Sequence, residues 1–213
     1  ESILDVGAGT GIYSFYLAKR DVKVTAIDLV LKNVEIMKEK NIVNQIKVMQ
    51  GDALDLSLFE DNSFDNVLCL GPLYHLEKES DKIQCLKECL RVLKKGGHLF
   101  VAYISNYAHF IVNVNYHEKI NHDMIRQNIE EGKEEGKSFY YLSPKQMDNL
   151  ISLFPMKNIF HLGTDGLSYL LKDKINNFNE EEFNCWLKYH LQTCEEQTLL
   201  GYSLHCLNIS QRI

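Results

Sequence analysis

Short apolar runs alternate with helix-length amphipathic stretches through the first half of the chain. The runs have the length and flanking turns of buried strands and occur at residues 3–6, 22–28, 46–51, 64–71 and 98–104. Helices are predicted between them at residues 11–19, 32–40 and 82–93. This alternation predicts a doubly wound α/β fold, in which helices cover both faces of a mostly parallel sheet. Such sheets bind ligands beyond the carboxyl ends of their strands.

The second half of the chain is less regular. Residues 106–137 are polar and are expected to be helical in part. Ser143 followed by Pro144 predicts the start of a helix, and residues 156–163 predict a strand. Residues 168–199 are expected to form one or two helices, and residues 201–211 a final strand. We therefore expect a single domain over residues 1–213, with a lid insertion at about 105–140 and a second helical elaboration at about 168–199.

Composition and charge narrow the class of protein. The chain of 213 residues has 45% hydrophobic and 24% charged residues and a net charge of −6, which disfavours a dedicated nucleic-acid binder. It has no apolar run long enough for a transmembrane helix and no secretory leader, so no membrane partner is expected. Six cysteines without a C-x-x-C pair favour reduced thiols packed as small hydrophobes in a cytoplasmic protein.

Metal sites are not expected, although two groups were considered. Cys185, His190 and Cys194 match no common zinc spacing. His117 and His122, with Glu118 and Asp123 beside them, are five residues apart, which is poor for one helical face.

A glycine-rich loop follows the first predicted strand. The stretch "ILDVGAGTG" places glycines at positions 7, 9 and 11 before a helix, so the backbone is free to approach a ligand closely. A dinucleotide fingerprint would need a third glycine where Ile12 stands, which disfavours a nicotinamide oxidoreductase. Acids at or after the predicted strand ends, Asp5, Asp28 and Asp52, suit a cationic ligand better than a pyrophosphate. Read individually, each of these acids is also explained as a cap, a turn residue or a solvated strand end.

These motifs resemble class I S-adenosylmethionine-dependent methyltransferases over almost the whole chain. The resemblance is carried in order by "DVGAGTG", "AID", "QGDAL", "FDNVLCLGPLYHL" and "RVLKKGGHLFVAYIS", with "LGYSLHCLNISQR" as the last strand. It implies a Rossmann-like seven-stranded sheet with an antiparallel last strand and S-adenosyl-L-methionine as cofactor. It also implies a lid segment before the first strand, which we expect to be missing because the first strand begins at residue 2 or 3.

The resemblance assigns cofactor contacts residue by residue. Asp28 matches the acid that binds the ribose hydroxyls, Asp52 and Ala53 match the adenine site, and Asp5 lies near the methionine moiety. The cofactor contacts implied are Asp5, Gly7, Ala8, Gly9, Gly11, Asp28, Leu29, Gly51, Asp52, Ala53, Leu70 and Gly71.

The residues that contact the acceptor are harder to predict from the sequence, because methyl transfer depends largely on the positioning of the reactants. His75, on the loop after the fourth strand, is the candidate general base; packing against the cofactor is the equally weighted alternative. Tyr74, Tyr103, Asn106 and Tyr107 are candidate acceptor contacts, with amphipathic packing as the alternative. "LGPLY" lacks the amide or acid and the second proline of base-methylating enzymes, so nucleic acid is not expected as acceptor.

The function predicted is methyl transfer to a small-molecule acceptor whose O, N, S or C atom is open. Two alternatives remain at this point. One is a non-catalytic cofactor-binding or partner protein of the same fold, and the other is a methyltransferase that acts on a macromolecule. The oligomeric state is open as well.

Overall fold

The computed structural model describes residues 1–42, 45–116, 120–133, 136 and 138–213. The strands are β1 (Ser2–Val6), β2 (Lys23–Asp28), β3 (Ile46–Gln50), β4 (Phe64–Cys69), β5 (Leu93–Ile104), β6 (Met156–Gly163) and β7 (His205–Arg212). The helices are α1 (Ile12–Ala18), α2 (Leu31–Lys40), α3 (Glu79–Val92), α4 (Asn106–Tyr116), α5 (His122–Ile125), α6 (Pro144–Ser152), α7 (Lys172–Ile175), α8 (Glu180–Thr193) and α9 (Gln197–Leu200). Two short turns of other helix types complete them, the 3-10 helix η1 (Pro72–His75) and the π-helical η2 (Arg126–Glu130).

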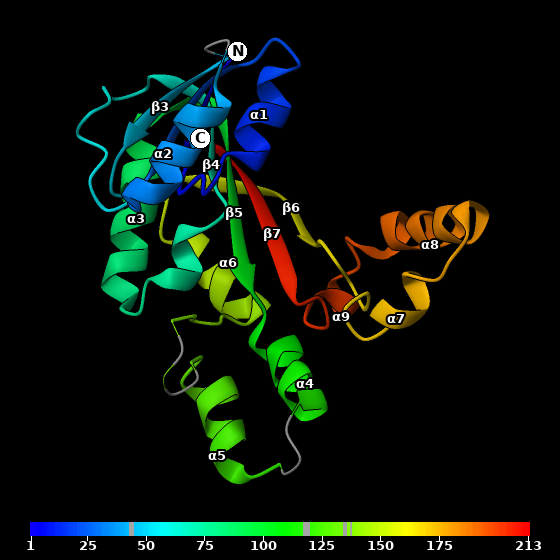
Figure 1. The fold of residues 1–213 in the computed structure, drawn as a ribbon. Coiled ribbons are helices and arrows are strands. Elements are labelled where there is room, and N and C mark those ends of the chain that lie inside the picture. Colours follow the sequence, from blue (N-terminus) through cyan, green and yellow to red (C-terminus); the bar gives the residue numbers. More distant parts are fainter. Residues whose placement is uncertain (43–44, 117–119, 134–135, 137) are drawn as a thin grey trace. The chain divides into compact units, whose positions relative to one another are not determined.

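The strands form one seven-stranded sheet in the order β3-β2-β1-β4-β5-β7-β6 (Figure 1). The pairs β1·β2, β1·β4, β2·β3 and β4·β5 are parallel, and the last strand is antiparallel, as the sequence predicted. This order reverses direction between β1 and β4, so the carboxyl ends of these two strands border the crevice in which doubly wound folds bind ligands.

Two compact units divide the chain. The first comprises Glu1–Ala102, Ser152–Ile159 and Ile209–Ile213, and the second Tyr103–Ile151 and Phe160–Asn208. In the first unit, Val34 and Met37 of α2 pack on the buried residues Val24, Ala26 and Ile46 of β2 and β3. The glycine loop, the ends of β2, β3 and β4, and η1 all belong to this unit.

The turn between α3 and β5 differs from the sequence expectation. We expected the fifth strand to start at His98, but β5 begins at Leu93, which pairs with Phe64 of β4. The next pair is Asn66 with His98, so residues 94–97 are an irregularity inside the strand rather than a loop before it. Gly96 has φ 77°, and the left-handed conformation lets the chain turn back into the ladder.

Candidate cofactor site

Three glycines shape the loop after β1, each with a left-handed backbone. Gly7, Gly9 and Gly11 have φ of 70°, 58° and 83°. A Cβ on Gly7 would lie 2.9 Å from the ring of Pro72, and one on Gly11 would lie 2.9 Å from the ring of Phe15. A Cβ on Gly9 would meet nothing within 4 Å. Gly7 and Gly11 therefore have no room for a side chain within the protein, whereas Gly9 borders open space.

The loop is fastened to the end of β2. The amide of Ala8 donates to the carbonyl of Ile27 at 2.9 Å, and the amide of Gly9 donates to Asp28 Oδ2 at 2.8 Å. Asp28 Oδ1 accepts from the amide of Val30 at 2.9 Å and from Asn33 Nδ2 at 3.0 Å. An ionised carboxylate offers about four acceptor positions, so these three bonds leave capacity for one further donor.

Asp5 lies at the base of the loop and is only 2% exposed. Burial raises the pKa of its carboxyl to about 6, and the hydrogen bond from Ser14 works in the opposite direction. Ser14 Oγ donates to Asp5 Oδ2 at 2.6 Å and is the buried residue of α1. Sequence reasoning found Asp5 but missed Ser14, whose signal is a small polar residue on the inner face of a short helix.

The residues after β3 form a tight turn. The amide of Gly51 donates to the carbonyl of Asp28 at 3.2 Å, which joins this turn to the end of β2. Asp52 Oδ1 accepts from the amide of Leu54 at 2.9 Å and is exposed. Asp52 therefore has the turn-forming role that was its alternative assignment, and the bond leaves its other oxygen available.

The segment after β4 lies against the glycine loop. A Cβ on Gly71 would be 3.0 Å from the carbonyl oxygen of Gly7. Tyr74 and His75 end η1, and their rings are 4.9 Å apart and tilted by 57°. Burial raises the pKa of the Tyr74 phenol, whereas the His75 side chain is exposed. The first unit thus brings together the cofactor residues assigned from the sequence, with Tyr74 and His75 on the adjoining segment.

The remaining acceptor candidates lie in the second unit. Tyr103, 1% exposed, has its hydroxyl 2.8 Å from His161 Nε2, and His161 Nδ1 is 2.9 Å from Asp148. His161 and Asp148 were not found from the sequence, because His161 lies within an apolar strand with no motif around it. Asn106 is buried, and its Oδ1 has no hydrogen-bond partner in the described part of the chain. Tyr107 is 44% exposed.

The second unit also contains an apolar cavity of about 370 Å³. Its walls include Leu167, Leu170, Trp186, Tyr189 and Tyr202. The volume lies within the usual range for small-molecule sites, which are mostly apolar with few polar groups.

The structure describes all the members of only one of the two metal groups considered from the sequence. Among the described residues, three or more His, Cys, Asp or Glu ligand atoms gather only at Cys69, Cys85 and Cys89. Cys185, His190 and Cys194 do not form such a group, and His117 and Glu118 lie outside the described residues. No helix in the described ranges is both long and apolar enough to cross a membrane.

Comparison with known proteins finds a methyltransferase domain in the first half of the chain. A family model described as "Methyltransferase domain" matches residues 4–101. The chain contains a class I methyltransferase domain. The methyltransferase domain spans the glycine loop, all the cofactor residues assigned above, and η1. S-adenosylmethionine is the cofactor of this class.

Curated relatives of the methyltransferase domain act on different molecules. Cypemycin N-terminal methyltransferase of Streptomyces is 33% identical over 47% of this chain and 40% of its own length. Ubiquinone biosynthesis O-methyltransferase of Xanthomonas oryzae is 33% identical over 47% and 41%. Demethylmenaquinone methyltransferase of Staphylococcus aureus is 42% identical over 44% and 39%. The matches thus span about two fifths of the relatives' length.

Solved structures match the fold of the whole chain. A SAM-dependent methyltransferase from Methanosarcina mazei has a TM-score of 0.66 at 19% identity, covering 100% of this chain and 92% of its own. The [4+2]-cyclase SpnF has a TM-score of 0.62 at 17% identity, covering 99% and 75%. At these identities the matches establish the fold and nothing finer.

Proposed function

We propose that this protein transfers a methyl group from S-adenosylmethionine to a small-molecule acceptor. The observation that carries the proposal is the open space at Gly9, beside a loop whose other two glycines are closely packed. At Gly9 a ligand can approach the backbone closely, because neither a side chain nor a neighbouring protein atom lies in the way, and the carboxylate of Asp28 is bonded to the same residue.

The residues present fit this cofactor. The backbone of residues 7–11 would lie along the methionine part, and the remaining acceptor position of Asp28 would take a ribose hydroxyl. Leu29, which is 61% exposed, and the turn at Gly51, Asp52 and Ala53 would cover the adenine, and Leu70 and Gly71 would border the methyl group. When bound, the cofactor supplies an electrophilic methyl group on a cationic sulfonium.

The buried carboxyl of Asp5 adds an electrostatic argument. Its pKa of about 6 means that the group ionises close to neutral pH, where it favours a nearby cation. The ammonium and sulfonium of the cofactor are both cationic, whereas a pyrophosphate would be repelled. We therefore expect cofactor affinity to increase as the pH rises through 6.

Within the first unit, the acceptor is proposed to meet Tyr74, with His75 as the base that removes its proton. Tyr103, Asn106 and Tyr107, which belong to the second unit, stay predictions from the sequence. The match of this domain to ubiquinone biosynthesis O-methyltransferase and demethylmenaquinone methyltransferase supports a small acceptor. Nothing in the motif after β4 suggests a nucleic-acid base as acceptor.

Replacement of His75 by Ala should lower the turnover number by about 10²–10⁴, because a general base contributes that much. Affinity for the demethylated cofactor, measured by calorimetry, should stay unchanged. His98→Ala, which replaces a histidine of β5 outside the assigned site, is the matched control. Wild-type turnover in His75→Ala would leave positioning alone as the source of catalysis.

Two measurements test the proposal as a whole. The demethylated cofactor should raise the unfolding temperature, with about 2.7 kcal/mol of stabilisation at a hundredfold excess over Kd, while NAD should not. Labelled methyl groups from S-adenosylmethionine should then appear in quinone, phenol, thiol or amine candidates. Stabilisation by NAD alone would overturn the assignment of the cofactor.

A second candidate is a cofactor-binding protein that transfers no methyl group. The structural match to a cyclase favours keeping it, because the same fold there serves a different reaction. Cofactor binding without any labelled product from a broad acceptor panel would support this candidate over the first.

A further inference from the structure

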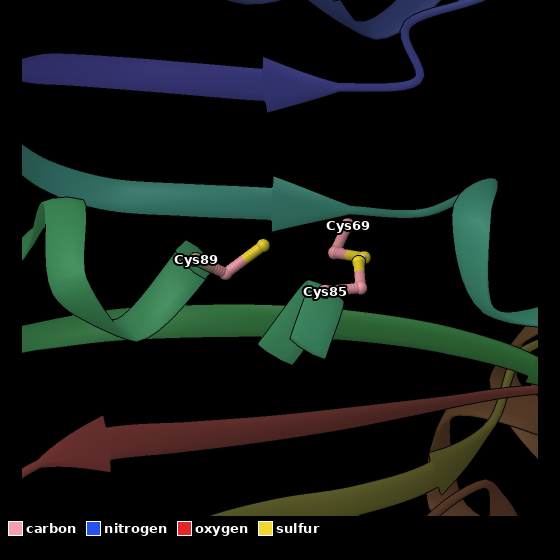
Figure 2. Close-up of side chains that lie close together, drawn as sticks. All are labelled: Cys69, Cys85 and Cys89. Carbon is pink, nitrogen blue, oxygen red and sulfur yellow. The ribbon is translucent and has the colours of Figure 1, made fainter. Parts of the chain in front are cut away.

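Three cysteine side chains meet in the interior of the first unit. Cys69 ends β4, and Cys85 and Cys89 lie one turn apart on α3, with their side chains directed toward β4 (Figure 2). The Sγ atoms of Cys69 and Cys85 are 3.7 Å apart, and all three Sγ atoms lie within 4.8 Å of one another. Each of the three residues has an exposed fraction of 0%. None of them belongs to the cofactor contacts assigned above.

The separations match those of sulfur atoms around one shared centre. With metal–sulfur bonds of about 2.3 Å, three sulfurs on a single ion lie ~3.5–4.0 Å apart, depending on whether the arrangement is pyramidal or planar. The pair Cys69 and Cys85 is already at this distance, and small rotamer changes would bring Cys89 to it. A disulfide would instead need one pair to close to about 2.05 Å, and it would leave the third thiol unused.

Charge selects the kind of ion. Burying an uncompensated charge costs several kcal/mol, so a fully buried site favours a neutral complex. Three thiolates leave a net charge of −2 on a monovalent ion and −1 on a divalent ion, but none on a trivalent ion. Zinc would also need a fourth ligand for its tetrahedral geometry, whereas only three ligand atoms gather here among the described residues.

We propose that Cys69, Cys85 and Cys89 form a binding site for a trivalent thiophilic metalloid, represented by arsenic(III). Neutral arsenous acid and three neutral thiols condense to a neutral tris-thiolate with release of three waters, so each As–O bond is replaced by an As–S bond and each thiol proton leaves in water. No oxidant or reductant takes part.

The condensation of arsenous acid with three thiols, as written, exchanges no net protons with water. Arsenite affinity should therefore be nearly independent of pH around neutrality. A divalent cation that displaces thiol protons would instead bind more tightly as the pH rises.

Native mass spectrometry of the reduced protein with sodium arsenite as the probe tests the site. We expect one adduct, in which one arsenic replaces three hydrogens. The variants Cys69→Ala, Cys85→Ala and Cys89→Ala should each weaken binding by about 10²-fold, because one of three linked bonds is lost. Cys206→Ala, also buried but outside the group, and Cys185→Ala, exposed, are the matched controls and should bind as the wild type does.

A measurement on the wild type keeps the test independent of how the variants fold. Arsenite should raise the unfolding temperature of the reduced protein, whereas arsenate, which lacks this thiol chemistry, should leave it unchanged. Absence of the adduct, binding as tight as that of the wild type in the three cluster variants, or loss of binding in Cys185→Ala would each overturn the proposal.

Discussion

Gly9 and Gly7 share a left-handed backbone but differ in what lies beyond the missing side chain. Gly9→Ala places a Cβ in open space, so the fold should lose only the ~1–2 kcal/mol of the left-handed conformation. Cofactor affinity should fall at least tenfold, because the methyl group occupies the ligand's space. Gly7→Ala should instead lower stability further, since its Cβ would lie 2.9 Å from Pro72. Chemical unfolding and calorimetry with the demethylated cofactor measure the two effects separately.

The opposite pattern would contradict this assignment of the loop. If Gly9→Ala binds the cofactor as the wild type does while its fold is intact, the open space at Gly9 does not receive the ligand. Gly96→Ala is a control, because it also has positive φ and no neighbour within 4 Å of its Cβ but lies far along the chain, in the turn within β5.

The buried carboxyl of Asp5 makes stability depend on pH in an unusual direction for an acid. Its folded-state pKa is about 6, against 3.8 without the protein environment. Between these values the unfolded chain loses the proton more readily, so the contribution of Asp5 is fully present below about pH 4 and is lost as the pH rises through 6. At about 1.4 kcal/mol per pKa unit, the loss is about 3 kcal/mol.

The free energy of unfolding of Asp5→Asn should therefore increase relative to that of the wild type when the pH is raised from 4 to 7. Urea unfolding at both pH values measures this difference. Asp65→Asn is the control. A hydrogen bond from Lys94 lowers the pKa of the Asp65 carboxyl, so its contribution is already present above the ordinary value of 3.8, and the difference between that variant and the wild type should be nearly the same at pH 4 and pH 7. A pH-independent difference for Asp5→Asn would show that the carboxyl is not buried as described.

At the scale of elements, helices α6 and α8 both begin with a capping box but differ in how many of their side chains are buried. Ser143 Oγ accepts from the amide of Gln146 and Asn179 Oδ1 from that of Glu182, and in each case the second side chain returns to the cap residue. α6 buries Met147, Leu150 and Ile151, whereas α8 has no buried residue.

Ser143→Ala should therefore lower the global free energy of unfolding by about 1 kcal/mol, the usual value of a lost cap. Asn179→Ala should instead accelerate amide exchange within α8 and leave the global transition in place, because helix fraying there exposes no core. Hydrogen exchange with mass spectrometry and urea unfolding distinguish the two. Equal loss of global stability in both variants would contradict the difference in burial.

The elements also show where sequence patterns were sufficient. Ser143 with Pro144 located the start of α6, and the stretch 156–163 predicted as a strand matches β6 residue for residue, because both signals lie in consecutive residues. The start of α3 at Glu79, one turn earlier than expected, and the irregularity at residues 94–97 were missed. The start of α3 was missed because the first turn of this helix is polar. The irregularity was missed because it depends on the pairing of β5 with β4, and apolar periodicity records neither.

At the scale of the whole molecule, the helical elaboration of the second unit is separable from the cofactor residues. α7 and α8 have no buried residues, and every cofactor contact assigned above lies in the first unit. Replacement of residues 172–193 by a short Gly/Ser linker should therefore leave the affinity for the demethylated cofactor within about twofold, inside the usual error of additivity. Calorimetry measures the affinity, and circular dichroism of the deletion variant serves as the folding control. A large loss of affinity in a folded variant would contradict this separation.

The sheet and the position of the glycine loop at the carboxyl end of its first strand were predictable, because strand–helix alternation and the loop motif each lie in consecutive residues. The partners of the site residues were not, since they come from distant positions. Ser14 on Asp5, His161 on Tyr103 and the meeting of Cys69 with α3 each depend on tertiary packing. The sequence therefore indicates the candidate acids Asp5, Asp28 and Asp52 but not the side chains from distant positions that pack against the candidate residues.

The empty neighbourhood of Gly9 also has a use in living cells. A single methyl group there gives a protein expected to fold, to be expressed at normal levels and to lack only its cofactor. Replacing the chromosomal gene with the Gly9→Ala allele separates two phenotypes. One is caused by loss of the cofactor-dependent reaction, and the other by absence of the whole protein. A strain carrying the Gly9→Ala allele that grows like a clean deletion would attribute the physiological role to the reaction, and one that grows like its parent would attribute it to the scaffold.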